Sequence, residues 1–371
     1  MIDRLGRNIT YVRVSVTDRC NLRCRYCFYA DVAEHRQVAS FGRMTKETML
    51  AVLANIRRDL IAGDRIQFAF QGGEPTLAGL DFFREFVQQV EKTYAGIGVS
   101  YALQTNGILL EENWFRFLKQ KGFLVGLSLD LLSQCHDEAR VDSQGRGTFA
   151  QVVKTLEGLN RYGVEYNVLC TLTNPVARHP RKVWKQIENL DLKYVQFTPC
   201  LDDLEAKGSV YALTPERFGS FYSQLFRLWL EAFQKGSYRS IKLFDDVVNL
   251  LAYGIPTGCG MDGQCRQQLV VEADGSVYPC DFYCLDVYKT GNLAQQSLRE
   301  VYESPVNQTF TRRAYSQPKI CSGCPYWRIC GGNCKRLQTA FCGERMCGYR
   351  TFLEEALPAL QQIARQQRGR R

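Results

Sequence analysis

The chain has 371 residues, of which 45% are hydrophobic and 23% charged, the composition of an ordinary soluble globular enzyme. Its net charge is +9, but four arginines lie in the last seven residues, which leaves +5 for the remainder and gives little reason to expect nucleic-acid binding. No run reaches the roughly 18 apolar residues of a membrane helix, and the first residues lack the apolar stretch of a signal peptide, so we expect a cytoplasmic protein that makes no contact with a membrane.

Short β-rich runs alternate with helical patterns in the first two thirds of the chain. The expected strands are 11–16, 66–70, 99–105, 124–129, 166–172 and 194–197, and the expected helices are 45–60, 80–94, 111–121, 148–162 and 180–190. Thr214, Pro215 and Glu216 have the order of N-cap, N1 proline and first-turn acid that begins another helix. Six β/α units predict a parallel sheet, either open and doubly wound or a partial (β/α)6 TIM-type barrel.

The pattern changes after about Phe244. Two extended runs flank Asp274 and Gly275, which predicts a hairpin, and cysteine-rich loops then lead to a last helix at 349–364. Because this region has little apolar periodicity, we expect its fold to depend on metal. The basic end, 365–371, reads as a solvated and frayed tail.

The chain contains 16 cysteines and three histidines. In a reducing compartment these cysteines indicate metal binding rather than disulfides, and the few histidines disfavour a histidine-rich metallohydrolase site. Three cysteines, at C-x3-C-x2-C spacing, follow the first expected strand: Cys20, Cys24 and Cys27. A four-iron cluster held by three thiolates leaves one iron open for chemistry, whereas a zinc knuckle is the alternative for such thiols.

With Tyr26 before its last cysteine, this motif resembles the radical S-adenosylmethionine superfamily. The resemblance implies that S-adenosylmethionine chelates the open iron and is cleaved to a 5′-deoxyadenosyl radical, which takes a hydrogen atom from the substrate. It also implies that the Gly-Gly-Glu-Pro turn after the second strand holds the cofactor's amine, although the same sequence alone would be an ordinary turn. The implied cofactor-binding residues are Tyr26, Gln71, Gly72, Gly73, Glu74, Ser128 and Arg140; for Ser128 and Arg140 a cap and a surface cation are the alternatives.

The C-terminal cysteines resemble the cluster-binding SPASM domain. The resemblance implies two auxiliary clusters fully ligated by protein, so the chain would hold three [4Fe-4S] clusters. The first auxiliary set is Cys259, Cys265, Cys280 and Cys334, and the second is Cys321, Cys324, Cys330 and Cys347. Zinc is the alternative metal, and Cys342 competes with Cys347 as the last ligand. We expect the remaining cysteines, including Cys284, to be small buried side chains.

Motifs along nearly the whole chain, among them "FAFQGGEPTLAG", "CGMDGQC" and "VVEADGSVYPCDFY", resemble the anaerobic sulfatase-maturating enzymes. The resemblance implies an oxidoreductase that converts a Cys or Ser in a Cys/Ser-x-Pro-x-Arg segment of a sulfatase to Cα-formylglycine by hydrogen abstraction from Cβ. Asp281 would accept the substrate proton, and Tyr29, Gln71 and Asn106 would line the substrate pocket, with local capping or packing as their alternative. The implied electron donor is a flavodoxin or ferredoxin.

Three alternatives remain open at this point. The beginning of the chain looks like the pterin-forming radical enzyme of molybdenum-cofactor synthesis, which carries fewer cluster ligands. A maturase that forms thioethers or other crosslinks in a small precursor would usually carry an additional leader-binding segment, and only 19 residues precede Cys20. An electron-transfer protein would not explain the Gly-Gly-Glu-Pro turn.

The motifs divide the chain into four expected regions. These are a radical S-adenosylmethionine barrel at 8–235, a connecting helical segment at 236–258, a SPASM domain at 259–364 and the tail at 365–371. Eleven thiolates on three clusters would nearly neutralise the folded body, so we expect no nucleic-acid partner. The sequence does not distinguish cysteine from serine substrates, nor does it identify the sulfatase, the reductant or the oligomeric state.

Overall fold

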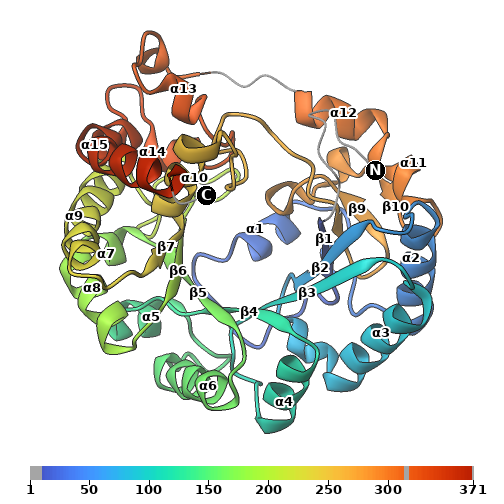
Figure 1. Cartoon of the computed structure of the whole chain (residues 1–371). Coiled ribbons are helices and arrows are strands. Elements are labelled where there is room, and N and C mark those ends of the chain that lie inside the picture. The colour runs from blue at the N-terminus through green and yellow to red at the C-terminus, as the bar shows by residue number, and fades with distance from the viewer. Residues whose placement is uncertain (1–10, 313–316, 370–371) are drawn as a thin grey trace. The chain divides into compact units, whose positions relative to one another are not determined.

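A computed structural model describes residues 11–312 and 317–369 (Figure 1). The chain divides into two compact units, each built from segments that are distant in sequence. Unit 1 comprises residues 1–128, 140–166 and 267–313, and unit 2 comprises 129–139, 167–266 and 314–371. Each unit is described by itself.

The strands of unit 1 lie in the order β10-β9-β8-β1-β2-β3-β4. β8 and β1–β4 are parallel neighbours, while β9 is antiparallel to β8 and β10. Their bounds are β1 (Tyr11–Ser15), β2 (Arg65–Gln71), β3 (Gly98–Thr105), β4 (Phe123–Ser128), β8 (Val270–Val271), β9 (Ser276–Tyr278) and β10 (Gly291–Asn292). The hairpin expected about Asp274 and Gly275 is therefore present as β8–β9. It extends the sheet beside β1, and Asp281 follows three residues after the end of β9.

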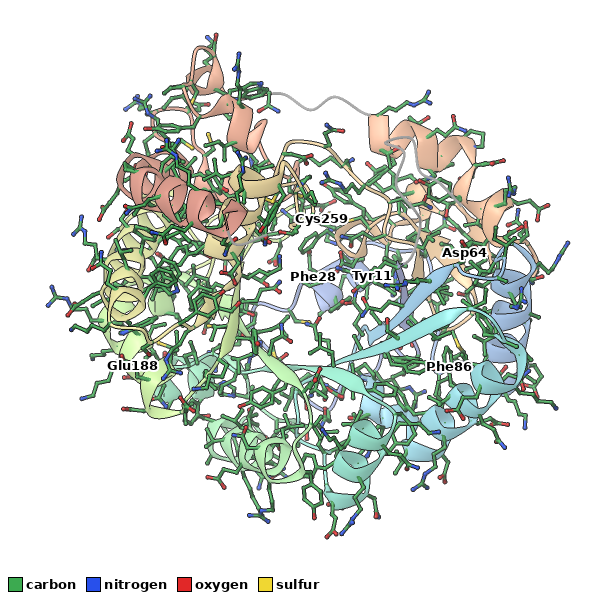
Figure 2. All side chains as sticks on the ribbon, in the orientation of Figure 1. Tyr11, Phe28, Asp64, Phe86, Glu188 and Cys259 are labelled. Atoms are coloured by element: carbon green, nitrogen blue, oxygen red, sulfur yellow. The ribbon has the colours of Figure 1, made fainter. Side chains whose placement is uncertain are left out.

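Amphipathic helices bury their apolar stripes against the strands of unit 1. Phe86 of α3 reaches β2, where its ring centroid lies 5.1 Å from that of Phe68 (Figure 2). The helices are α1 (Phe28–Glu34), α2 (Lys46–Arg58), α3 (Leu80–Thr93), α4 (Glu112–Gln120), α6 (Phe149–Tyr162), α11 (Leu298–Tyr302) and α12 (Pro305–Arg312), with short 3₁₀ turns η1 (Pro75–Ala78), η2 (Asp281–Tyr283) and η3 (Asp286–Tyr288). This packing leaves the loops after the strands as the place where polar groups collect.

Unit 2 contains three parallel strands and an aromatic helical core. The strands are β5 (Tyr166–Leu172), whose first residue belongs to unit 1, β6 (Tyr194–Pro199) and β7 (Ser240–Ile241). The helices are α5 (Ser133–Ala139), α7 (Asn174–Ala177), α8 (Pro180–Asn189), α9 (Pro215–Gln234), α10 (Lys242–Tyr253), α13 (Trp327–Cys330), α14 (Gln338–Phe341) and α15 (Gly348–Arg368), with the 3₁₀ turn η4 (Lys319–Cys321). Phe244 of α10 stacks on Phe352 of α15 with centroids 5.6 Å apart, which ties these helices together.

The expected parallel-dominated α/β architecture is confirmed. All six expected strands form, and no end is shifted by more than two residues. Within each unit, strands that are consecutive along the β/α repeat are neighbours in the sheet, the order of a barrel rather than of a doubly wound sheet. No helix in the described ranges is both long and apolar enough to cross a membrane.

The expected frayed tail is wrong in its first part. Helix α15 continues through Arg368, whose guanidinium donates to the carbonyl oxygens of Leu251 and Ala252 in the last turn of α10. Those carbonyls have no partner within their own helix, so the arginine serves as their cap. Arg370 and Arg371 lie outside the described residues.

Candidate functional site

The three cysteines of the first motif occupy the loop between β1 and α1. Cys27 is the N-cap of α1, and its carbonyl oxygen accepts the backbone N–H of Ala30 at 3.1 Å. The backbone N–H of Leu22 donates to Cys20 Sγ at 3.4 Å. The loop is thus shaped by its own backbone at the carboxyl end of a parallel strand, where α/β folds place their chemistry.

Hydrogen-bond donors surround these sulfurs. Asn106 Nδ2 lies 3.9 Å from Cys20 Sγ, and Arg140 Nη1 lies 3.9 Å from Cys24 Sγ. Such N–H donors fit the charged thiolates of an iron–sulfur cluster. Burial raises the pKa of the Cys20 thiol to about 11, so metal binding has to supply the free energy that removes its proton. Among residues 11–312 and 317–369, no three His, Cys, Asp or Glu side chains gather closely enough for a single metal ion, whereas a four-iron cluster binds each thiolate to a different iron.

The Gly-Gly-Glu-Pro turn after β2 lies against the chain that leads to Cys20. The N–H groups of Gly73 and Glu74 donate to the carbonyl oxygens of Thr17 and Arg19 at 3.1 and 2.8 Å. A Cβ on Gly73 would come within 2.2 Å of the Arg19 oxygen, and Gly72 has a φ of +123°. Only glycine permits this approach and this backbone conformation.

The Glu74 carboxylate is buried and accepts hydrogen bonds from three neighbouring residues. It is 1% exposed; Oε1 accepts from the Thr76 hydroxyl at 2.6 Å and the Thr105 hydroxyl at 2.7 Å, while Oε2 accepts from the Asn106 N–H at 2.8 Å. Burial raises the pKa of Glu74, and these hydrogen bonds oppose that rise. Glu74, which we expected to bind the cofactor, therefore also joins the loop after β2 to the loop after β3.

Tyr26 and Arg140 lie together beside the cysteine loop. The Arg140 guanidinium carbon is 5.5 Å from the Tyr26 ring centroid, within cation–π range. Arg140 is 8% exposed, so it is a buried cation and not the surface cation of the alternative. Ser128, at the end of β4, is also buried. The Arg140 cation and the Ser128 hydroxyl are therefore available to bind the carboxylate of a ligand in this region.

Asp281 follows β9 and is the first residue of the 3₁₀ turn η2. Its Oδ2 pairs with the Arg13 guanidinium of β1 and lies 3.4 Å from Nε2 of Gln71, the last residue of β2. Its Oδ1 lies 3.6 Å from Cys280 Sγ. Phe282 packs on Phe28 of α1 with ring centroids 4.7 Å apart, which holds the turn beside the cysteine loop.

The two other residues expected at the substrate have different surroundings. Tyr29 is half-buried, and burial, followed by the Asp281 charge, raises the pKa of its phenol well above the ordinary value, so the phenol stays protonated. The Asn106 side chain is engaged locally: Nδ2 donates to Asn21 Oδ1 at 2.8 Å, and Oδ1 accepts the Ile108 N–H at 3.0 Å. Asn106 thus braces the residue next to Cys20.

Three cysteines of the first auxiliary set lie in unit 2. Gly260, next to Cys259, approaches Cys334 so closely that a Cβ on the glycine would be 2.8 Å from the cysteine Cβ. Gly263 and Gly331 are in backbone contact as well. The loops that carry Cys259, Cys265 and Cys334 are therefore packed together, while Cys280 belongs to unit 1.

The second auxiliary set lies entirely in unit 2. Cys347 is the N-cap of α15, where its Sγ accepts the Arg350 N–H at 3.4 Å. A hydrogen bond from the Cys342 thiol lowers the pKa of Cys347 to about 6. Cys342 Sγ also lies 4.0 Å from Cys321 Sγ, so a further thiol stands beside two of the four expected ligands, Cys321 and Cys347.

Two family models match the chain in the regions just described. The radical SAM superfamily matches residues 14–179, and the SPASM iron-sulfur cluster-binding domain matches residues 259–325. A cysteine-type anaerobic sulfatase-maturating enzyme from Clostridium perfringens is 39% identical over 354 residues, 93% of this chain and 95% of that protein. The chain belongs to the anaerobic sulfatase-maturating enzymes.

Other members of this family agree over similar lengths. A serine-type enzyme from Klebsiella aerogenes is 28% identical and covers 94% of this chain and 85% of its own length. The solved structure of native anSMEcpe with bound AdoMet and Cp18Cys peptide has a TM-score of 0.88 and 37% identity, covering 96% of this chain and 98% of that one. The two domain families imply [4Fe-4S] clusters and S-adenosylmethionine as cofactors.

Within unit 1, the structure brings together most of the residues that the sequence singled out for this family. The cysteine loop, the glycine turn, Arg140 and Asn106 share direct contacts, and Asp281 reaches Gln71. The sequence did not lead us to Arg13, which pairs with Asp281. A charged residue inside the apolar strand "YVRVSV" was the available signal, because such a side chain needs a partner where strands are buried.

Proposed function

We propose that this enzyme oxidises the active-site cysteine of a sulfatase to Cα-formylglycine. The observation that carries the proposal is the similarity over 93% of the chain to a cysteine-type enzyme, together with a carboxylate, Asp281, beside the loop that would hold the first cluster. When bound, S-adenosylmethionine and the clusters supply a hydrogen-abstracting radical and an acceptor for one electron.

The chain's own residues then have separate tasks. Cys20, Cys24 and Cys27 hold the first cluster, and the glycine turn with Arg140 and Ser128 orients the cofactor's amine and carboxylate. The substrate loses a hydrogen atom from Cβ, one electron and the thiol proton, and water then replaces sulfur to give the aldehyde and hydrogen sulfide. Asp281 accepts the thiol proton, since its carboxylate lies beside the proposed cluster ligand Cys280.

Two sets of four cysteines would hold the auxiliary clusters. Cys259, Cys265, Cys280 and Cys334 would ligate one auxiliary cluster and Cys321, Cys324, Cys330 and Cys347 the other. Tyr29 and Gln71 would face the substrate peptide, which has a Cys-x-Pro-x-Arg segment. A flavodoxin or ferredoxin supplies the electrons, and the enzyme works in the cytoplasm. Because the thiolate-bound clusters offset the basic charge of the chain, nucleic acid is not a partner.

The test is anaerobic reconstitution with iron, sulfide, S-adenosylmethionine and a reductant. Matched 18-residue peptides carry Cys-x-Pro-x-Arg, Ser-x-Pro-x-Arg or Ala-x-Pro-x-Arg, and mass spectrometry follows the aldehyde while chromatography follows 5′-deoxyadenosine. We expect aldehyde from the cysteine peptide at the highest rate, less from serine and none from alanine. Production of 5′-deoxyadenosine without aldehyde would overturn the proposed substrate and favour a different peptide modification.

A further inference from the structure

We propose that Arg13 is a positioning residue that fixes the plane of the Asp281 carboxylate and so places one of its oxygens to accept the substrate proton. The inference rests on the proposed function, because it takes Asp281 as the proton acceptor. It concerns a contact between residues 268 positions apart that lie within one compact unit.

The two carboxylate oxygens of Asp281 have different surroundings. Arg13 Nη1 and Gln71 Nε2 both donate to Oδ2. Oδ1 is the oxygen on the side of Cys280 Sγ. Because both donors bind Oδ2, the oxygen in the Oδ1 position is the one that can take a proton from substrate.

Arg13 is well placed to hold this orientation. It lies in the middle of β1 between β2 and β8, in register with Ala69 and Val270, and its N–H donates to the Leu269 carbonyl oxygen at 3.1 Å. Its side chain is 18% exposed and that of Asp281 11%, so solvent screens their interaction only weakly. The guanidinium thus approaches Asp281 from a fixed strand rather than from a loop.

A fixed cation is needed because an aspartate carboxylate rotates easily. Its terminal torsion joins sp³ and sp² carbons and has a broad, roughly two-fold energy profile. Without Arg13 the carboxylate keeps only the 3.4 Å contact with Gln71, so its plane is free to rotate and the accepting oxygen moves away from the substrate sulfur. A misplacement of about 1 Å can cost about 100-fold in rate.

The expected signature is uncoupling rather than simple loss of activity. Hydrogen abstraction from Cβ does not need Asp281, so 5′-deoxyadenosine continues to form in an Arg13 variant. Transfer of the thiol proton to Asp281 becomes slow, so less aldehyde forms for each 5′-deoxyadenosine. A role of Arg13 in folding alone would lower both products together.

The experiment measures the molar ratio of aldehyde to 5′-deoxyadenosine for the reconstituted full chain with the cysteine peptide. We expect Arg13→Gln to lower the ratio at least about tenfold and Arg13→Lys, which keeps the cation but not the planar fork, about threefold. Arg116→Gln breaks an exposed pair with Glu112 on α4 and should leave the ratio unchanged. An unchanged ratio in Arg13→Lys or Arg13→Gln overturns the inference.

A double-variant cycle tests whether Arg13 acts through Asp281. We expect Asp281→Asn to lower the ratio strongly and Arg13→Gln to add no further decrease in that background. Equal fold-changes from Arg13→Gln in both backgrounds would contradict the inference.

Failure of the proposed function and failure of this inference give different results. If the wild-type chain makes no aldehyde, both fail. If the wild type makes aldehyde and Arg13→Gln has the wild-type ratio, only the inference fails. Iron content of each variant verifies that the clusters are loaded, and Arg13→Lys decides the matter if Arg13→Gln does not fold.

Discussion

The Glu74 carboxylate, in the turn after β2, accepts a 2.8 Å hydrogen bond from the backbone N–H of Asn106, just after β3. The Asn106 side chain in turn donates to Asn21, the neighbour of Cys20. A continuous set of hydrogen bonds therefore joins the proposed cofactor turn, the end of the next strand and the first cluster loop. Because the first of these contacts is buried and the second part-buried, the three loops are expected to move as one body.

Removing this carboxylate should destabilise the protein. Glu74→Ala leaves the buried donors of Thr76, Thr105 and Asn106 without their acceptor, and we expect a loss of about 3 kcal/mol or more in the free energy of unfolding. Urea unfolding of the anaerobic, reconstituted protein measures it. Glu91→Ala, which removes an exposed pair with Lys121, should change the value by about 0.5 kcal/mol at most. Similar losses in the two variants would show that the buried contacts contribute little.

The glycine turn makes a second, more local prediction. Gly73→Ala places a Cβ 2.2 Å from the Arg19 carbonyl oxygen, so the turn or the cluster loop has to shift. We expect at least about tenfold weaker binding of S-adenosylmethionine, measured anaerobically by equilibrium dialysis. Gly369→Ala is the matched control, because that glycine has a φ of −73° and its Cβ would meet nothing closer than 3.8 Å. Wild-type affinity in Gly73→Ala would mean that the turn does not need this close approach.

Local sequence patterns predicted the parts of the site that consist of a single loop. The spacing of Cys20, Cys24 and Cys27 and the glycines of the turn carry their chemistry within a few residues, so their roles could be inferred without a fold. Strand positions were equally accessible, because alternation and apolar runs determine which residues face the core.

Contacts between distant segments could not be predicted in this way. Arg13 meets Asp281 because the β8–β9 hairpin extends the sheet beside β1, and that pairing depends on the whole of unit 1. The inward orientation of Glu74 depends likewise on the β2–β3 register, which brings Thr105 within 2.7 Å. Arg368 was assigned to a tail because its partners lie in α10, more than a hundred residues earlier.

A buried acid beside β1 predicts a pH dependence of stability. Glu272, 4% exposed, lies 3.5 Å from the Arg36 guanidinium. Burial raises its pKa above the ordinary 4.5, the Arg36 charge opposes this rise, and the charge of Asp18 adds to it. The folded state therefore holds the Glu272 proton more tightly than the unfolded state. The resulting contribution to stability is complete below pH 4.5 and is lost as the pH rises through the folded-state pKa.

The test compares the wild type with Glu272→Gln, which cannot ionise. We expect the free energy of unfolding of the wild type to fall relative to that of the variant as the pH is raised from about 5 to about 8. Urea unfolding at several pH values at constant salt measures the difference. A difference that grows in favour of the wild type at higher pH would mean that Arg36 outweighs burial.

The last prediction concerns the two cysteines that compete for the second auxiliary cluster. Cys347 caps α15, and the helix N-terminus together with the Arg350 N–H favours its thiolate form. A hydrogen bond from the Cys342 thiol lowers the pKa of Cys347, so we expect Cys342 to be the poorer ligand. We expect Cys347→Ser to lower bound iron from about 12 to about 8 per chain and Cys342→Ser to retain about 12. Iron analysis measures the iron content of both variants, and Mössbauer spectroscopy shows whether a cluster is lost or changed in type. The reverse pattern would make Cys342 the ligand, and full iron in both variants would mean that each thiol can replace the other.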